Sequence, residues 1–315
     1  MSNSLKTAVL LLIFNRPDKT AQVFEKIRQV KPLKLYVACD GPREGIKGEK
    51  EKVTMAQEIA TNVDWPCNVK KLFREKNLGC KRGVGTAVTW FFQNEEQGII
   101  LEDDCMPHID FFAFCENLLN RYAKDNRVSV ITGNNFQKGK WRGEASYYFS
   151  TYNHCWGWAS WKRAWKQYQE DINFWPEMKF SYAWKKFKTN NREREYWEKI
   201  FDQSYAGQID TWDYSWTAST WYKNGVTATP NVNLVSNIGF GEEATHTKEK
   251  FNKCSNLPTY ALSHITHPKE VKIDKDADQF TFQNVFQNKY SHFPFNWLLL
   301  PFRIFNYIFR KTIDR

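Results

Sequence analysis

The chain has 315 residues, of which 42% are hydrophobic and 25% charged, so it is too apolar for a disordered chain. Its length suits one large α/β domain or two fused smaller ones. A formal charge of +10 attracts phosphates on nucleotides, nucleic acid or anionic lipid, and the 14 Trp fit either stacking on sugar rings or a bulky core.

The cysteine pattern and the N-terminal residues bear on the compartment. The seven Cys are scattered, odd in number and without a Cys-x-x-Cys pair, which favours reduced thiols in a cytoplasmic protein. The apolar run Ala8–Phe14 is short and has no small-residue cleavage site after it, so we expect a buried strand there and no signal peptide. No run of about twenty apolar residues predicts a membrane-spanning helix.

The first half of the chain alternates between strand and helix patterns. Strands are predicted at Ala8–Phe14, Leu33–Cys39, Val69–Phe73, Gly98–Leu101 and Val128–Thr132. Helices are predicted around 23–30, with Asp18 as a plausible N-cap, over 50–62 and 85–97, and from Pro107 onward. This alternation predicts a mostly parallel sheet flanked by helices, with ligands bound beyond the carboxyl ends of its strands.

The second half has a different composition but no linker. Residues 147–222 are rich in Trp and Tyr, and helices are expected near 161–168 and 192–205. We therefore predict one domain over 1–285, in which residues 1–135 bind a nucleotide and 136–285 shape an acceptor site. Residues 286–315 form an aromatic and basic tail.

The strongest chemical signal is an acidic run at the end of a predicted strand. Leu101–Cys105 reads LEDDC, and adjacent carboxylates repel one another unless a cation or a proton relieves them. Hard oxygen ligands suit Mg²⁺ or Mn²⁺, either of which can bridge a diphosphate. Acids after a strand are also common as solvated side chains, so the run needs converging groups to define a site.

Further polar groups follow the neighbouring strands. Asp40 ends the second strand, where it is placed to accept hydrogen bonds from a base or ribose. Arg74, Asn77 and Lys81 precede the next predicted helix, so that basic side chains and backbone N–H groups are available to phosphates. Neither a GxGxxG nor a Walker A sequence is present.

Four segments in this order carry a family resemblance: FNRP (14–17), CDGPR (39–43), FREKNLGCKRG (73–83) and GIILEDD (98–104). They resemble the nucleotide-sugar-binding half of GT-A glycosyltransferases, above all bacterial family-two-like enzymes, and are distantly similar to N-acetylglucosaminyltransferase I. The resemblance implies a Rossmann-like α/β fold and a Mn²⁺ or Mg²⁺ ion bound by Asp104. It further implies donor contacts from Asn15, Arg16, Asp40, Glu102 and Asp103.

The same resemblance assigns a general base. Ile209–Trp216 reads IDTWDYSW, and inverting members of this fold keep an acid beside aromatic residues downstream of the metal motif. Asp213 is the first candidate and Asp210 the second. The alternative is that Asp213 caps a helix or accepts a hydrogen bond from a buried Trp.

Two later segments extend the predicted site. In NIGFGEEATHT (237–247), the glycines suggest a loop that closes over the donor, and His246 is the candidate to complete the metal shell. HCWGWASW (154–161) resembles an acceptor segment, so Trp156 and Trp158, together with Trp212, are predicted to stack on acceptor sugars. Core packing is the alternative for these Trp side chains.

These features predict a glycosyltransferase that moves a sugar from a nucleotide diphosphate sugar to a surface-glycan acceptor, free or lipid-linked. The tail from Phe293 to Arg315 mixes bulky apolar and basic residues, which favours contact with the inner face of the cytoplasmic membrane over packing on the domain. The alternatives are a non-catalytic carbohydrate-binding protein, a nucleic-acid-binding protein and a nucleotidyltransferase that makes the activated sugar. The nucleotidyltransferase shares the alternating α/β plan, but the Gly-rich N-terminal loop of pyrophosphorylases is missing from this sequence. The dispersed basic residues and the absence of a known binding module disfavour nucleic acid.

Overall fold

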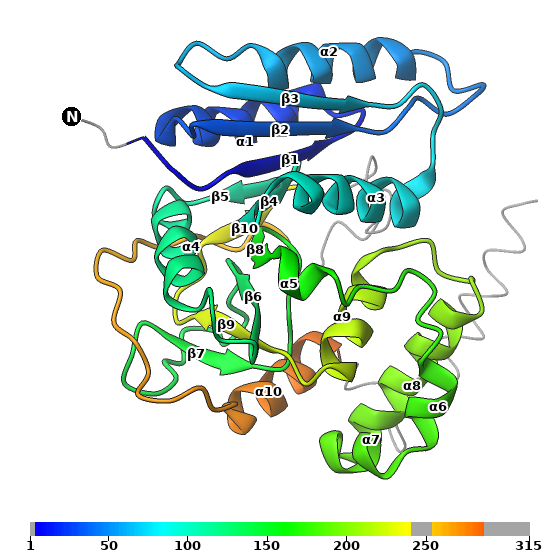
Figure 1. Ribbon diagram of the computed structural model, residues 1–315, viewed down its shortest axis with the longest axis vertical. Helices are drawn as coiled ribbons and strands as arrows, with labels where there is room; N and C mark the ends of the chain where they lie inside the picture. The colour runs from blue at the N-terminus through cyan, green and yellow to red at the C-terminus, as the bar shows by residue number, and fades with distance from the viewer. Residues whose placement is uncertain (1–3, 241–253, 287–315) are drawn as a thin grey trace, which may run out of the picture.

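The computed structural model describes residues 4–240 and 254–286, which form an eight-stranded sheet covered by helices on both faces. The strand order is β3-β2-β1-β4-β8-β6-β9-β7, from the top to the bottom of Figure 1. Pairing is parallel except where β8 and β7 join their neighbours, so the predicted mostly parallel α/β sheet is confirmed. The strands are β1 Val9–Ile13, β2 Lys34–Cys39, β3 Asn68–Phe73, β4 Gln97–Glu102, β6 Val128–Thr132, β7 Tyr147–Ser150, β8 Trp158–Trp161 and β9 Val226–Pro230.

β1 shows why the central strands are apolar without interruption. All five of its residues are buried, and alternate side chains pack on opposite faces of the sheet. Val9 and Leu11 face α1 Pro17–Val30, α2 Glu49–Thr61 and α4 Asp110–Arg121. Leu10 and Leu12 face the other cluster, which includes α3 Gly79–Asn94 and α5 Lys162–Trp165.

A long insertion between β8 and β9 holds many of the aromatic residues. It contains α5 and four further helices: α6 Trp175–Phe180, α7 Tyr182–Phe187, α8 Asn191–Tyr205 and α9 Asp213–Tyr222. α6, α7 and α8 gather at the lower right of Figure 1, away from β1–β3. Their aromatic side chains build a third apolar cluster, in which Trp175, Trp184, Trp197 and Trp221 are each no more than 2% exposed.

A two-stranded ribbon lies beside the end of β4. After the turn at Asp103 and Asp104, β5 Cys105–Pro107 pairs antiparallel with β10 Val235–Asn237. The prediction that a helix starts at Pro107 is therefore wrong, because Pro107 ends a strand and α4 begins at Asp110. The predicted N-cap Asp18 is likewise wrong, since it lies inside the first turn of α1, which begins at Pro17.

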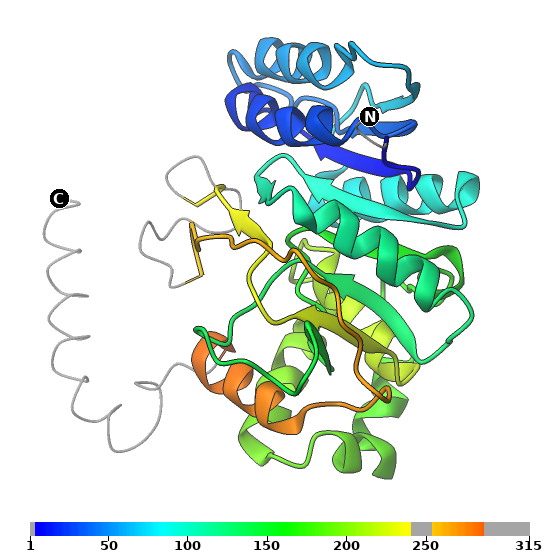
Figure 2. The same ribbon diagram turned by 90° about the vertical axis from the view of Figure 1, so that its left-hand side faces the viewer.

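The sheet continues across the boundary predicted at residue 135. β4 from the first half pairs with β8 from the second, so both halves share one sheet. Residues 254–274 then run along one side of the molecule to α10 Lys275–Thr281, drawn in orange in Figure 2, and a single π-helical turn follows at Phe282–Phe286. No helix in the described ranges combines the length and apolarity needed to cross a membrane.

Trp158 provides a test of the core assignment. Its ring is 1% exposed and stacks on Trp212 with ring centroids 5.5 Å apart. Replacing Trp158 with Ala should lower the free energy of unfolding by about 3–5 kcal/mol in urea titrations, because it leaves a large cavity under β8. Trp141, which is 55% exposed, is the control, and Trp141→Ala should change stability by less than about 0.5 kcal/mol. A loss below about 1 kcal/mol for Trp158→Ala would show that the site collapses or that the ring is not core.

Candidate functional site

The acidic run Glu102–Asp104 lies at the carboxyl end of β4, between the ends of the sheet's parallel strands and the β5–β10 ribbon. Asp103 is 6% exposed and accepts a hydrogen bond from the Phe14 N–H at 3.0 Å, just beyond the end of β1. Asp104 accepts a hydrogen bond at 2.7 Å from the guanidinium of Arg16, whose Nη1 also lies 3.7 Å from Asp103. Both carboxylates thus bind the segment that follows β1, which is the neighbour of β4 in the sheet.

The backbone that follows β10 passes very close to Asp104. The Ile238 N–H donates to the Asp104 carbonyl at 2.8 Å, and a Cβ placed on Gly239 would lie 1.9 Å from Oδ2 of Asp104. Only glycine permits that approach. Gly239, which the sequence suggested as part of a loop, therefore fixes the segment after β10 against the acidic turn.

Burial and mutual repulsion disfavour the charged forms of Glu102 and Asp103. Burial, reinforced by Asp104 and Asp103, raises the pKa of Glu102 well above its ordinary range. Burial and the neighbouring Asp104 likewise raise the pKa of Asp103 to about 7. Burial on its own would lower the pKa of Arg16, but the charges of Asp103 and Asp104 raise it, so Arg16 stays a cation.

Asp213 lines the same cavity as the acidic cluster. It is the first residue of α9, and its charge contributes to the raised pKa of Glu102. Its carboxylate accepts hydrogen bonds from the Thr211 hydroxyl and from the Tyr214 N–H. These are contacts with near neighbours in the chain; the N-cap position of α9 belongs to Trp212, so Asp213 is not the helix cap. Its role as a base stays a prediction.

One cavity of about 780 Å³ contains these groups and extends well beyond them. It begins at the carboxyl ends of β1, β2 and β4, beside apolar residues of α3, and passes between the acidic turn and Asp213. It ends among side chains from the β7–β8 connection, α8, α9 and the π-helical turn. That aromatic end is lined by Phe136, Tyr152, Asn153, His154, Cys155, Trp156, Trp197, Tyr214, Thr217, Val285 and Phe286.

None of the described residues that line the aromatic end carries a formal charge near pH 7. Burial lowers the pKa of His154 to about 3, so its imidazole is neutral near pH 7. Asn153 and Trp197 are 4% and 2% exposed, and neither the Asn153 amide nitrogen nor the Trp197 indole N–H has a hydrogen-bond partner within the described chain. Buried donors of this kind ordinarily find an acceptor in protein, water or ligand. Trp156, His154 and Cys155 belong to the predicted acceptor segment 154–161, whereas Phe136, Trp197 and Phe286 were not predicted because they come from segments far apart in sequence.

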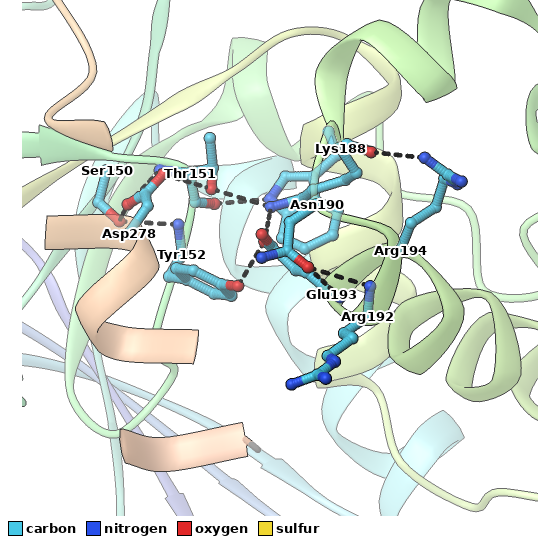
Figure 3. A network of polar contacts seen from close by, with 10 residues as sticks. Ser150, Thr151, Tyr152, Lys188, Asn190, Arg192, Glu193, Arg194 and Asp278 are labelled. Atoms are coloured by element: carbon cyan, nitrogen blue, oxygen red, sulfur yellow. Dashed lines mark hydrogen bonds and ion pairs between the residues drawn. The ribbon is translucent and has the colours of Figure 1, made fainter. Parts of the chain in front are cut away.

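A polar network includes the hydroxyl of Tyr152, a residue that lines this wall (Figure 3). The Lys188 ammonium, in a side chain 4% exposed, donates to Glu193 at 2.6 Å, and the Tyr152 hydroxyl donates to the same carboxylate oxygen at 2.6 Å. Asp278 of α10 accepts hydrogen bonds from Ser150 and Thr151, residues next to Tyr152 in the chain. The network therefore holds β7, α8 and α10 together around the Tyr152 ring that lines the cavity.

The predicted donor residues fall into two groups. The cavity wall includes Arg16, Asp40, Arg74, Asn77, Glu102 and Asp103, as well as the predicted metal ligand Asp104. Two others lie off it. Asn15 donates to Glu49 at 2.8 Å, and Lys81, 9% exposed, pairs with Asp171 at 2.9 Å. Both side chains are engaged in links between structural elements and do not face the cavity.

The N-terminus of α3 is already occupied by two carboxylates. Asp40 accepts hydrogen bonds from the N–H groups of Leu78 and Gly79, and Asp210 accepts from those of Cys80 and Lys81. The helix N–H groups expected to meet phosphates are therefore satisfied within the protein. Asp210, the second candidate for the base, serves as a cap for a helix 130 residues earlier in the chain.

The three predicted acceptor Trp residues lie in different environments. Trp156 lines the cavity, where its ring contacts Phe136 and Phe240 edge-on. Trp158 belongs to β8 and is buried in the core, so core packing describes it and sugar stacking does not. Trp212 reaches the cavity wall but is only 2% exposed and stacks on Trp158.

Two predictions concern residues outside the described ranges. His246, the candidate for the metal shell, and the tail from Phe293 to Arg315 both lie there. Within residues 4–240 and 254–286, no three His, Cys, Asp or Glu side chains are grouped so as to hold a metal ion by themselves. All seven Cys are free thiols, as predicted.

Comparisons with known proteins add little. No family model matches the chain, and no curated protein sequence matches it. Among solved structures, the chain is similar to a UDP-glucose pyrophosphorylase complexed with UDP-glucose, at 8% sequence identity and a TM-score of 0.37, over 71% of this chain and 90% of that one. A likeness this low transfers no function from one protein to the other.

The neutral state of His154 predicts a pH dependence of stability. The unfolded chain takes up a proton on this residue below about pH 6.5, whereas the folded protein does so only near pH 3. The contribution of neutral His154 to the free energy of unfolding is therefore lost as the pH falls from about 6.5 toward 3. Between pH 7 and 4.5 the wild type should lose roughly 2 kcal/mol more than His154→Gln in urea unfolding. The exposed His264 is the control, since His264→Gln should follow the wild type. Parallel pH profiles for His154→Gln and the wild type would refute the neutral assignment.

Proposed function

We propose that this protein is a metal-dependent glycosyltransferase that transfers a sugar from a nucleotide diphosphate sugar to a glycan acceptor. One observation carries the proposal: a single cavity joins a cation-poor acidic turn, a second acid on an opposing helix, and an uncharged aromatic end. A transferase of this kind needs a place for a charged donor, a base and a place for a neutral acceptor. The family resemblance of the sequence motifs points to the same activity.

The residues present fit a divalent ion of the Mg²⁺ or Mn²⁺ type. Glu102, Asp103 and Asp104 supply hard carboxylate oxygens at one turn. Burial and the neighbouring carboxylates raise the pKa of Glu102 and of Asp103, so a cation placed beside them would stabilise their charged forms. Such ions are usually held by one or two carboxylates together with substrate phosphates, so the lack of an all-protein ligand group among the described residues is consistent with this assignment. When bound, the ion would neutralise charge on the departing nucleoside diphosphate.

The donor would occupy the end of the cavity near β1, β2 and α3. Leu12, Ala38, Val84 and Ala87 give this end an apolar wall suited to a planar base. Arg74 lines it as well and supplies positive charge for phosphates. Asp40 is committed to the N–H groups that precede α3, so we expect it to shape this end and not to bind a ribose through both oxygens.

The acceptor would occupy the aromatic end. Aromatic faces pack on the C–H faces of sugars, and the unpartnered N–H groups of Asn153 and Trp197 are suitable donors to acceptor hydroxyls after small side-chain shifts. The described residues of this wall are uncharged, which favours a neutral sugar over an anionic one. A surface-glycan precursor, lipid-linked or free, fits this class. Contact with the inner face of the cytoplasmic membrane through the tail stays a prediction from sequence.

In the transfer step we assign the base to Asp213. Its carboxylate would take the proton of an acceptor hydroxyl, and the oxygen would attack the anomeric carbon as the bond to the diphosphate breaks. The electron pair of that bond leaves with the nucleoside diphosphate, and the configuration inverts. Asp213 lines the same cavity as the acidic turn and the aromatic side chains, and its charge acts on Glu102, which supports this assignment.

The donor is tested by thermal shift. UDP-, GDP- and dTDP-sugars, with and without Mn²⁺, should include one that raises the melting temperature only when the metal is present, because a ligand of the native state stabilises it. At a concentration of 100 Kd the gain is about 2.7 kcal/mol. If no nucleotide sugar binds while glycans alone do, a non-catalytic carbohydrate-binding protein is the better assignment.

The base is tested by a matched pair of variants. Asp213→Asn should lower kcat of sugar transfer by about 10²–10⁴-fold and leave donor binding intact, since the amide cannot accept the proton. Asp210→Asn is the control, because Asn is as good a helix cap as Asp and should retain activity. Transfer is measured as release of nucleoside diphosphate with acceptor present. Near-full activity of Asp213→Asn, or a greater loss with Asp210→Asn, would show that the base is misassigned.

A further inference from the structure

We propose that Arg16 holds the place of the divalent ion in the resting protein, so that the ion binds tightly only together with the donor's diphosphate. This inference rests on the proposed function for the identity of the ion and the donor. Before the ion and the donor bind, Arg16 neutralises part of the negative charge of the acidic turn.

Arg16 is positioned for this role by the connection between β1 and α1. It is the N-cap residue of α1, and Pro17 begins the helix directly after it. The side chain is only 12% exposed, and its Nη1 lies 2.7 Å from Oδ2 of Asp104 and 3.7 Å from Oδ1 of Asp103. An ion pair this close and this well buried, with a second carboxylate nearby, is a specific structural contact and not a solvent-exposed surface pair.

The guanidinium and a metal ion compete for the same oxygens. A divalent ion bound to Asp104 would meet Oδ2 already engaged by Arg16, while Oδ1 lies 3.6 Å from the Cys105 thiol. Gly239 packs against the same carboxylate, so Asp104 has little room to turn away. The ion can therefore approach only if Arg16 leaves or if the two cations share the cluster at a cost in repulsion.

The donor's diphosphate offers the Arg16 guanidinium oxygens that can replace those of Asp104. The planar guanidinium fits phosphate oxygens in the same bidentate way as carboxylates, and Arg16 lines the cavity next to the acidic turn. Because the described residues offer no group of three ligands for a metal, phosphate oxygens are also needed to complete its shell. The exchange of Arg16 from carboxylate to phosphate then couples metal binding to donor binding.

The test measures Mn²⁺ binding directly, by the electron paramagnetic resonance signal of the free ion, in the absence of sugar transfer. Without nucleotide, Arg16→Met should bind Mn²⁺ about tenfold more tightly than the wild type, because the competing charge is gone. Arg16→Lys keeps that charge and should stay within about threefold of the wild type. Addition of UDP should tighten Mn²⁺ binding strongly in the wild type and by a smaller factor in Arg16→Met.

Arg74→Met is the matched control. It removes an arginine from the same cavity, but Arg74 interacts with Asp40 and Thr86 and not with the acidic turn. Its Mn²⁺ affinity without nucleotide should equal that of the wild type. Unchanged or weaker Mn²⁺ binding by Arg16→Met, or equal tightening in Arg74→Met, would overturn the proposal.

A stability measurement covers the case in which Arg16→Met folds poorly without metal. Its melting temperature in EDTA should be lower than that of the wild type, and Mn²⁺ should raise it by more, since the ion replaces the missing cation. Equal Mn²⁺ shifts in both proteins would contradict the exchange. The two hypotheses fail separately: tighter Mn²⁺ binding by Arg16→Met without any sugar transfer by the wild type would overturn only the transferase assignment.

Discussion

The ion pair between Arg16 and the acidic turn is the interaction on which the site depends. Three consecutive acids at the end of a buried strand repel one another and lose hydration, which raises the pKa of Glu102 and Asp103. Arg16 and the Phe14 N–H offset part of this cost from the adjacent end of β1. The carboxyl ends of β1 and β4 are therefore linked by charge as well as by backbone pairing, and the remaining negative charge faces the cavity.

The other walls of the cavity come from the second half of the chain, which joins the sheet beside β4. β8 pairs antiparallel with β4, which brings the segment 152–158 past the acidic turn. The insertion between β8 and β9 returns through α9, whose first residue is Asp213. Behind them, the buried network of Lys188, Glu193 and Asp278 ties α8 and α10 to β7. These contacts make the aromatic end a wall of the same cavity.

Many of the aromatic side chains pack in apolar clusters and stabilise the fold. Trp158, Trp165, Trp212 and Trp216 pack against one another, and a second set with Trp197 and Trp221 fills the helical insertion. Clusters of this kind bury large apolar area in a region that has little sheet of its own. Some of the buried rings, such as Tyr152, Trp197 and Trp212, also line the cavity.

The sequence by itself determined the parallel core strands, the helices around them and the placement of acids at a strand end, because these depend on local periodicity and on the burial of both sheet faces. It could not show that Asp210 caps α3 or that Asn15 and Lys81 are engaged elsewhere, since those contacts join residues 34 to 130 positions apart. It also could not separate Trp156 at the cavity from Trp158 in the core, two residues away on opposite sides of Gly157. That distinction, and the pairing of Arg16 with Asp104, was decided only by tertiary structure, because side-chain partners and burial are set by which strands become neighbours.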